Sequence, residues 1–224
     1  MRLLAQVGSK RKAAKRLGEA IGGAGAGQEA SGEGRDSYEV CRKVAIEVIL
    51  LLKIILFVIA SAGMVSFSWP FLRNPKSHGF FRFFAFEFLL IQILVNVDQW
   101  FADPFSLHQI VSWLLLLSSL LLAAHGFHLL LTIGRPKGGF ENTTALVLRG
   151  AYKYIRHPLY ASLLLLEWGT FFKDPSLLGG SLALVISAFL IGTARMEEAE
   201  NLQKFGPDYA HYMKSTRMFI PFLF

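Results

Sequence analysis

The chain has 224 residues, of which 53% are hydrophobic and 17% charged, with a formal net charge of +7 and a mean hydropathy of +0.43. Ordinary soluble domains carry about 25% charged residues, so this composition argues against a soluble enzyme and favours a polytopic membrane protein. The single cysteine, Cys41, excludes an intrachain disulfide. The surplus positive charge flanks the apolar segments, which is typical of membrane loops rather than of nucleic-acid binding.

Residues 1–43 differ in composition from the rest of the chain. They contain nine Lys and Arg residues and the run GGAGAGQEASGEG, which cannot pack a core. We expect a mostly disordered tail, although a basic amphipathic helix over the first twenty residues stays open. No apolar stretch follows the early charges, which argues against a secretory signal peptide but leaves an organelle transit peptide open.

Five apolar segments approach the ~20 residues that a bilayer requires. They predict an all-α, polytopic membrane protein with about five transmembrane helices, three of them within residues 44–133. Lys173, Asp174 and Pro175 alone separate the last two segments, which predicts a tight helical hairpin. The fourth segment is short and contains Glu167, so we expect it to tilt or to be covered by protein. The segments are 44–66, 79–98, 108–133, 157–173 and 175–194.

The loop charges predict an orientation. The 134–156 loop and the C-terminal tail are rich in Lys and Arg, and the 70–82 loop contains Arg73, Lys76 and Arg82, so all three are expected in the cytosol. Five spans then place the basic N-terminal tail on the far side, against the same rule. Either the tail is an exception or the first segment does not span fully, and the sequence leaves both open.

The sequence RHPLY combines polar residues with the start of the fourth apolar segment. Pro158 suits a first helical turn, and His157 then occupies the cap position. His157 and Tyr160 share a helix face, and the N–H groups of that turn suit an anionic or polar ligand group. The alternative is that His157 only caps the helix while Tyr152, Tyr154 and Tyr160 form an interfacial aromatic belt.

Glu197 and Glu198 follow the fifth apolar segment. The hairpin places Tyr160 and Glu197 at the same membrane depth. Acidic residues at the C-terminal end of a helix oppose its dipole at up to ~1 kcal/mol each, which indicates a site for a cation or an amine. The alternative is a solvated acidic face that pairs with Arg195 and Lys204.

Two further polar features carry less weight. His125 and His128 have a spacing that could ligate a metal, but no third ligand accompanies them, so we favour a polar seam between helices and predict no metal. Glu167 is costly in lipid, which fits either a functional role or a structural hydrogen bond to a neighbouring helix.

Three stretches together resemble the isoprenylcysteine carboxyl methyltransferase family, which includes membrane phospholipid methyltransferases. The stretches are GAYKYIRHPLYASLLLLEWG, EEAENLQKFGPDYAHYMKS and the closing FIPF, and the resemblance covers about residues 134–224. It implies a catalytic region with a C-terminal interfacial helix and a cytosolic pocket for S-adenosylmethionine. It also implies a lipophilic or prenylated acceptor that enters from the bilayer. The resemblance assigns the cofactor to Thr144, Ala145, Leu146, Val147, Tyr152, His157, Pro158, Leu159, Tyr160 and Glu197.

Catalytic candidates depend on the acceptor. A carboxylate acceptor needs no base, whereas an amine would have to lose a proton, and Glu198 or Glu167 could accept it. The resemblance places a substrate-contacting arginine at the position of Thr193, so Arg195 is the nearest candidate. The family also has a glutamine near Lys137. Both departures weaken the case for an isoprenylcysteine carboxylate, and the oligomeric state is not indicated.

Two other functions compete with methyl transfer. Sterol reductases of the same membrane superfamily share an RHP-Y element but use a nicotinamide cofactor and usually show a different stretch around Arg195. A non-catalytic membrane scaffold with the same fold is the second alternative. Binding of S-adenosylhomocysteine or of NADPH separates the three.

Overall fold

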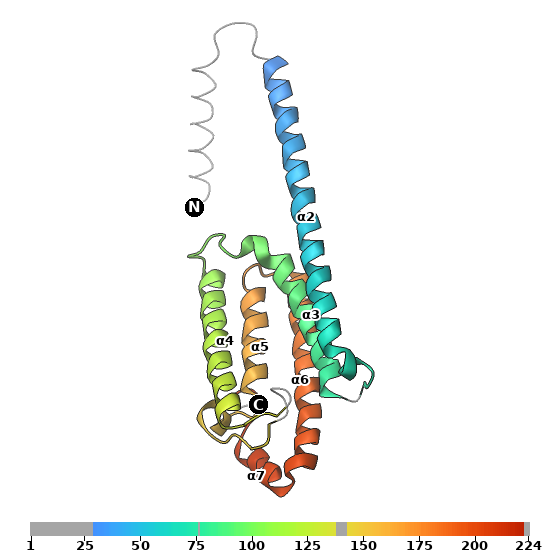
Figure 1. Ribbon diagram of the computed structural model, residues 1–224. Helices are drawn as coiled ribbons and strands as arrows, with labels where there is room; N and C mark the ends of the chain where they lie inside the picture. Colours follow the sequence, from blue (N-terminus) through green and yellow to red (C-terminus); the bar gives the residue numbers. More distant parts are fainter. Residues whose placement is uncertain (1–28, 76, 138–142, 222–224) are drawn as a thin grey trace. The chain divides into compact units, whose positions relative to one another are not determined.

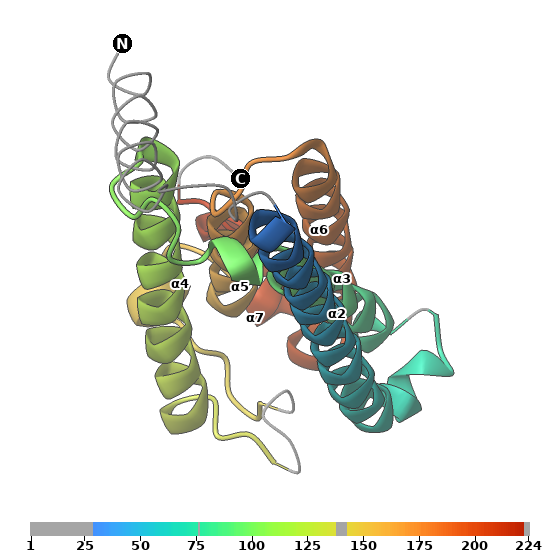
Figure 2. The ribbon, with the colours of Figure 1, turned by 90° about the horizontal axis from the view of Figure 1, so that it is seen from above.

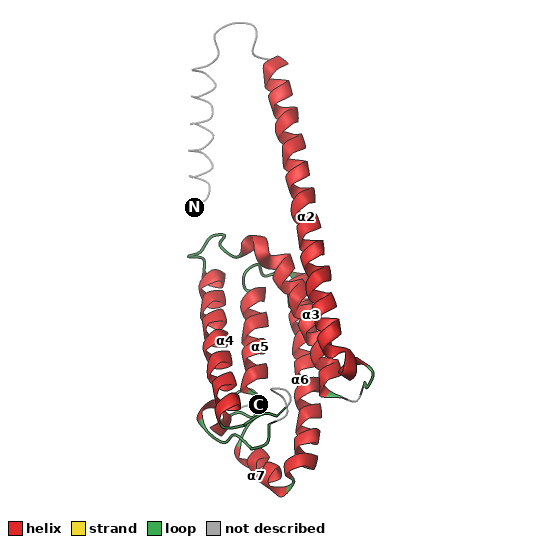
Figure 3. Ribbon diagram, in the orientation of Figure 1, coloured by secondary structure: helices red, strands yellow, loops and turns green. Residues whose placement is uncertain are grey.

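The described residues form helices, turns and loops, in agreement with the predicted all-α class (Figure 3). The computed structural model describes residues 29–75, 77–137 and 143–221, with side chains from Ser37 onward. The expectation of disorder for residues 1–28 lies outside this range. The chain divides into two compact units, Met1–Ile54 and Ile55–Phe224, and the candidate site lies entirely in the second.

Helix α2 (Glu29–Leu72) is longer than the predicted segment 44–66. Residues 29–43, which we expected to be largely disordered, belong to this helix, and that part of the prediction was wrong. Only the nucleation of a helix is costly, and each later residue adds one hydrogen bond. The apolar run therefore extends the helix into the polar residues before it.

Four helices of the second unit enclose the candidate site: α3 (His78–Asn96), α4 (Leu107–Thr132), α5 (Pro158–Phe171) and α6 (Leu177–Phe205). The bounds of α3 and α4 agree with the predicted segments to within two residues. Helix α3 packs against α6, α4 packs against α5, and α5 also contacts α6 (Figures 1 and 2). Helix α5 therefore connects α4 to the α3–α6 pair.

Helix α5 is too short to count as a full span. Its 14 residues extend about 21 Å, whereas the hydrocarbon core is ~30 Å thick. Among the described residues, four helices are long and apolar enough to cross a membrane, rather than the five predicted. The helix ends at Phe171 because a turn through Lys173 and Asp174 leads into Pro175, which cannot continue it.

Polar side chains of the flanking helices hold α5 in place. Four fully or nearly fully buried side chains of α3 and α4 donate hydrogen bonds to its backbone carbonyls. Such bonds stabilise helix contacts in apolar surroundings, so they hold α5 against its neighbours, chiefly along its C-terminal half. The pairs are Gln92 to Glu167 (2.8 Å), Asn96 to Thr170 (3.0 Å), Ser112 to Gly169 (2.6 Å) and Ser119 to Ser162 (2.7 Å).

Helix α6 continues well past the predicted end at residue 194. It ends at Phe205 because Gly206 takes a φ of 57° and Pro207 begins α7 (Pro207–Ser215). Glu197 and Glu198 are therefore about two turns before the helix end. The dipole penalty expected for them does not apply there, because the effect falls off within the last turn.

The C-terminal segment pairs with the residues before α5. Ile155 and Arg217 form a parallel bridge, in which the Arg156 N–H donates to the Arg217 carbonyl at 2.7 Å. The His157 N–H donates to the Met218 carbonyl at 3.1 Å. The closing stretch of the chain thus fixes the backbone of the RHPLY sequence.

Candidate functional site

A cavity of about 410 Å³ lies among α3, α4, α5 and α6. This volume is within the range of small-molecule sites. The lining combines polar and apolar side chains, so the cavity suits an amphipathic ligand. The polar lining residues include His78, Arg82, Tyr152, Arg156, His157, Tyr160, Glu197, Glu200, Asn201 and Lys204, and the apolar ones include Phe86, Ala123, Leu130, Leu159 and Leu163.

His157 lies at the predicted cap position, but its side chain makes no capping hydrogen bond. Its buried ring is directed instead toward α6, with Nε2 3.3 Å from Glu198 Oε1 and Nδ1 3.9 Å from Glu197 Oε2. The ring also stacks on Tyr160 at 5.5 Å between centroids. Tyr160 and Glu197, which the sequence analysis expected at the same membrane depth, both line the cavity.

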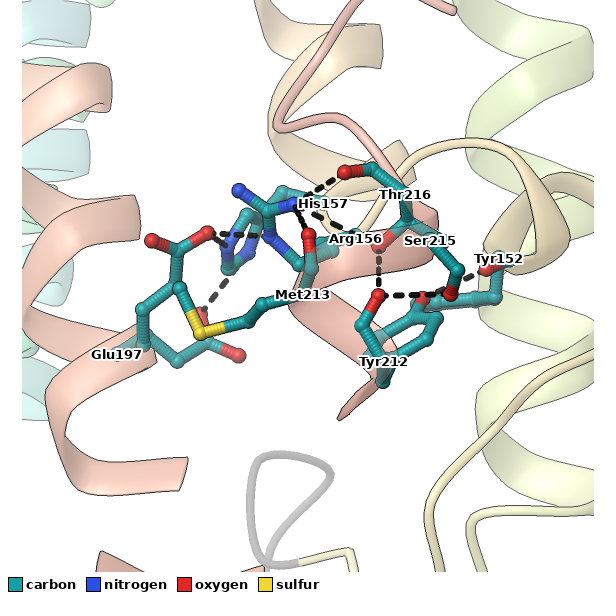
Figure 4. Close-up of polar contacts among 9 residues, drawn as sticks. Tyr152, Arg156, His157, Glu197, Tyr212, Met213, Ser215 and Thr216 are labelled. Atoms are coloured by element: carbon teal, nitrogen blue, oxygen red, sulfur yellow. Dashed lines mark hydrogen bonds and ion pairs between the residues drawn. The ribbon is translucent and has the colours of Figure 1, made fainter. Parts of the chain in front are cut away.

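Glu198 is engaged by an arginine. The Arg156 Nε–H donates to Glu198 Oε1 at 2.6 Å. Arg156 Nη1 donates to the carbonyls of Thr216 at 2.6 Å and Met213 at 3.2 Å (Figure 4). Glu198 is buried and does not line the cavity. Its contacts fit a residue that positions Arg156 and His157, rather than the base that we considered for an amine acceptor.

Glu197 has a different environment from its neighbour. It lines the cavity, and 34% of its side chain is exposed. The carboxylate is therefore available to a cationic ligand group, which meets it without displacing an arginine. Glu197 therefore faces the cavity, whereas Glu198, the next residue of the same helix, stabilises the cavity wall.

Two tyrosines form part of the wall around His157. Tyr152 is buried and lines the cavity, and its carbonyl accepts a hydrogen bond from the Tyr212 hydroxyl at 2.6 Å (Figure 4). Burial raises the pKa of both tyrosines well above the ordinary value, so both hydroxyls stay neutral at physiological pH. Tyr154 is 51% exposed and alone fits the interfacial belt among the three predicted tyrosines.

The loop before α5 is only partly at the cavity. Thr143 lines it, whereas Thr144 to Val147 do not, and neither does Pro158. The backbone N–H groups of Thr144 and Ala145 donate to the Gly134 carbonyl at 2.8 and 3.2 Å. These hydrogen bonds attach the loop to the end of α4. Because Thr144 to Val147 do not line the cavity, the lining does not support their predicted contact with a cofactor.

Two predicted catalytic residues lie away from the cavity. Arg195 is exposed and is not among the lining residues. Glu167 is fully buried in the middle of α5, where its Oε1 accepts a hydrogen bond from the Ser187 hydroxyl at 2.5 Å. This position fits the structural hydrogen bond considered for Glu167, and neither residue reaches the cavity lining.

The structure adds polar residues that sequence reasoning did not include. His78 Nδ1 lies 2.6 Å from Glu200 Oε2, which joins the start of α3 to α6 at the cavity. Arg82, which we placed in a loop, is a buried residue of α3 that lines the cavity. An arginine inside the apolar run FFRFFAF is costly in a membrane, and that signal could have identified it.

The two histidines of α4 have different surroundings. His125 Nε2 accepts a hydrogen bond from the Ala151 N–H, in the stretch before α5, at 3.4 Å. His128 is exposed. Among the described residues, no group of three potential ligands is placed to hold a metal ion.

Comparison with known proteins gives a family match over part of the chain. The phospholipid methyltransferase family matches residues 107–207, from the start of α4 to the start of α7. This chain is related to the membrane methyltransferases. The matched region contains RHPLY, the glutamate pair and three of the four helices that surround the cavity, and it begins after α3.

Two methyltransferase relatives share part of the sequence. Methanethiol S-methyltransferase 2 of Bradyrhizobium diazoefficiens is 35% identical over 75 residues, which are 33% of this chain and 27% of the relative. Methanethiol S-methyltransferase of Pseudomonas deceptionensis is also 35% identical over 75 residues, 32% of this chain and 27% of the relative. The chain thus matches about a quarter of the length of these relatives.

Proposed function

We propose that this membrane protein transfers a methyl group from S-adenosylmethionine and that the cofactor binds in the cavity between α3 and α6. The observation that carries the proposal is the position of Glu197. Its partly exposed carboxylate faces the same cavity as the His157–Tyr160 stack, in the region that matches the methyltransferase family.

The residues present fit the cofactor. A carboxylate such as Glu197 pairs with an ammonium group, and the aromatic face of Tyr160 suits a sulfonium or an adenine. Tyr152 and His157 add polar atoms to the same wall. When bound, S-adenosylmethionine supplies an electrophilic methyl group on a positively charged sulfur.

The main contribution of the protein to methyl transfer is to hold the cofactor and the acceptor in the right geometry. Methyl transfer is an in-line displacement, so a fixed geometry contributes most of the rate and no covalent protein intermediate is needed. Arg156 and Glu198 hold His157, and the hydrogen bonds to the α5 backbone hold the helix that carries it. Because Glu198 is engaged by Arg156, we favour an acceptor that reacts as an anion, such as a carboxylate or a thiolate.

The acceptor proposed is lipophilic. Phe86, Leu130 and Leu163 line the cavity beside its polar wall, and they come from three different apolar helices. A small thiol is the second candidate, because both relatives are named for methyl transfer to methanethiol. The relatives match only part of the chain, so the choice rests on experiment.

A labelled-methyl assay tests the function and separates the acceptors. The full chain in membranes receives methyl-labelled S-adenosylmethionine together with total lipids, a prenylcysteine analogue or methanethiol. We expect label in a lipid-soluble product, and a Glu197→Ala variant should lose at least about tenfold in rate. Arg195→Gln, an exposed change two residues away, is the matched control and should keep the rate. Label only in dimethyl sulfide would favour the thiol, and no label with any acceptor would contradict the proposal.

A further inference from the structure

A second concave site lies beside the methyltransferase cavity. It is a groove of about 210 Å³ between the end of the 3₁₀ turn η2 (Gly150–Lys153) and the end of α7. We call it the basic groove. Its lining residues are Lys153, Tyr154, Lys214, Ser215, Arg217 and Pro221.

Among the described residues, three cations line the basic groove and no acidic residue does. Lys153 comes from one chain segment, and Lys214 and Arg217 come from another, about sixty residues later. Within the described residues, none of the three side chains forms an ion pair. Like charges brought together from distant parts of the chain repel each other, so the fold keeps an unfavourable arrangement that an anion would neutralise.

The surroundings of the basic groove indicate a lipid. Tyr154 lines the groove and is 51% exposed, and Ile220, next to Pro221, is an exposed apolar residue. A tyrosine beside lysines and an exposed apolar side chain is the composition found where protein meets lipid headgroups. We propose that the basic groove binds the phosphate group of an anionic phospholipid.

Such binding would act on the wall of the larger cavity. The Arg217 N–H donates to the Tyr154 carbonyl at 3.1 Å, and the Arg217 carbonyl accepts from the Arg156 N–H at 2.7 Å. A phosphate held between Lys153 and Arg217 therefore joins the two segments whose pairing fixes Arg156 and His157. Anionic lipid should stabilise this pairing whether or not the protein is a methyltransferase.

Native mass spectrometry of the full chain in detergent tests the proposal directly. The protein is mixed with equal amounts of phosphatidylglycerol and phosphatidylcholine, and the bound lipid is counted. Each cation near a lipid phosphate is worth about a fivefold change in affinity. The double variant Lys214→Gln/Arg217→Gln should therefore lose phosphatidylglycerol by about 25-fold and keep phosphatidylcholine. The matched control is Arg135→Gln/Arg149→Gln, which removes two exposed charges from the loop outside the groove and should bind like the wild type.

Two outcomes would overturn the proposal. Equal retention of phosphatidylglycerol by the wild type and the groove variant would show that the groove does not bind it, and equal loss in both double variants would show a diffuse charge effect. A titration with inorganic phosphate separates the sources of the anion. We expect millimolar phosphate to leave bound phosphatidylglycerol in place, whereas complete displacement would assign the groove to a soluble phosphate instead.

Discussion

Arg156 and Glu198 form an ion pair in which each side chain is only 10% exposed. Each partner also contacts the site in another way, because Arg156 bonds the C-terminal carbonyls and Glu198 approaches His157. Removing one partner of a buried pair leaves the other charge uncompensated, which commonly costs about 3–5 kcal/mol. The pair is therefore a stability element as well as part of the cavity wall.

The variant Glu198→Ala should lower the unfolding temperature of the purified protein by about 10 °C, since it leaves the Arg156 guanidinium buried without its carboxylate. Thermal unfolding in detergent, followed by intrinsic fluorescence, measures the shift. Glu198→Gln, which keeps an acceptor oxygen, should show a smaller loss. Glu197→Ala is the adjacent control and should leave stability nearly unchanged; equal losses at both positions would contradict the division of roles.

At the residue scale, sequence reasoning found the side chains of the local motif and missed those contributed by distant helices. Tyr152, His157, Tyr160 and Glu197 line the cavity as expected. The position of Arg82 in an apolar run was a signal that went unused, whereas His78 was missed because the sequence shows no register between α3 and α6. That register depends on how the side chains of the two helices interdigitate, which no local pattern records.

At the scale of elements, the apolar runs predicted where helices occur but not where they end. The apolar segments predicted the bounds of α3 and α4 closely, because these two helices begin and end near the ends of their apolar runs. Helices α2 and α6 continue beyond their apolar runs, since polar helix formers extend a nucleus at little cost until Gly206 and Pro207 intervene. The hydrogen bonds from amide and hydroxyl side chains to the α5 backbone were not predictable, because a single Ser or Asn in an apolar helix does not reveal its partner.

Gly150 offers a test of the junction before α5. Its φ of 59° is unfavourable for other residues, and an added Cβ would clash with His125 Nε2 and lie 2.6 Å from Leu129 Cδ1. Gly150→Ala should therefore destabilise the protein by about 2–3 kcal/mol, seen as a lower unfolding temperature. Gly63→Ala is the control, because a Cβ there meets nothing within 4 Å and alanine favours the helix. Equal stability of the two variants would contradict the close packing of η2 against α4.

At the scale of the whole molecule, the helix order predicts which loops share a membrane face. Helices α4 and α6 end near the cavity and α5 begins there, whereas the 97–106 connection lies at the other end of α3 and α4 (Figure 1). The loop charges predict that the cavity end faces the cytosol. This orientation stays a prediction.

Cysteine labelling tests the orientation. In a Cys41→Ser background, single cysteines at Lys204 and Phe105, both exposed, are treated with a membrane-impermeant maleimide in intact cells and in inverted vesicles. We expect the Phe105 position to react in intact cells and the Lys204 position only in inverted vesicles, because they lie at opposite ends of the bundle. Labelling of both from the same side would contradict the predicted arrangement.

The proposed function requires the cavity to be a binding site for S-adenosylmethionine. Isothermal titration of the full chain in detergent with S-adenosylhomocysteine tests this without an acceptor, and NADPH titrated in parallel tests the reductase alternative. We predict saturable binding of S-adenosylhomocysteine that Glu197→Ala weakens by about 10- to 100-fold and that Arg195→Gln leaves intact. Binding of NADPH alone, or of neither compound, would contradict the account.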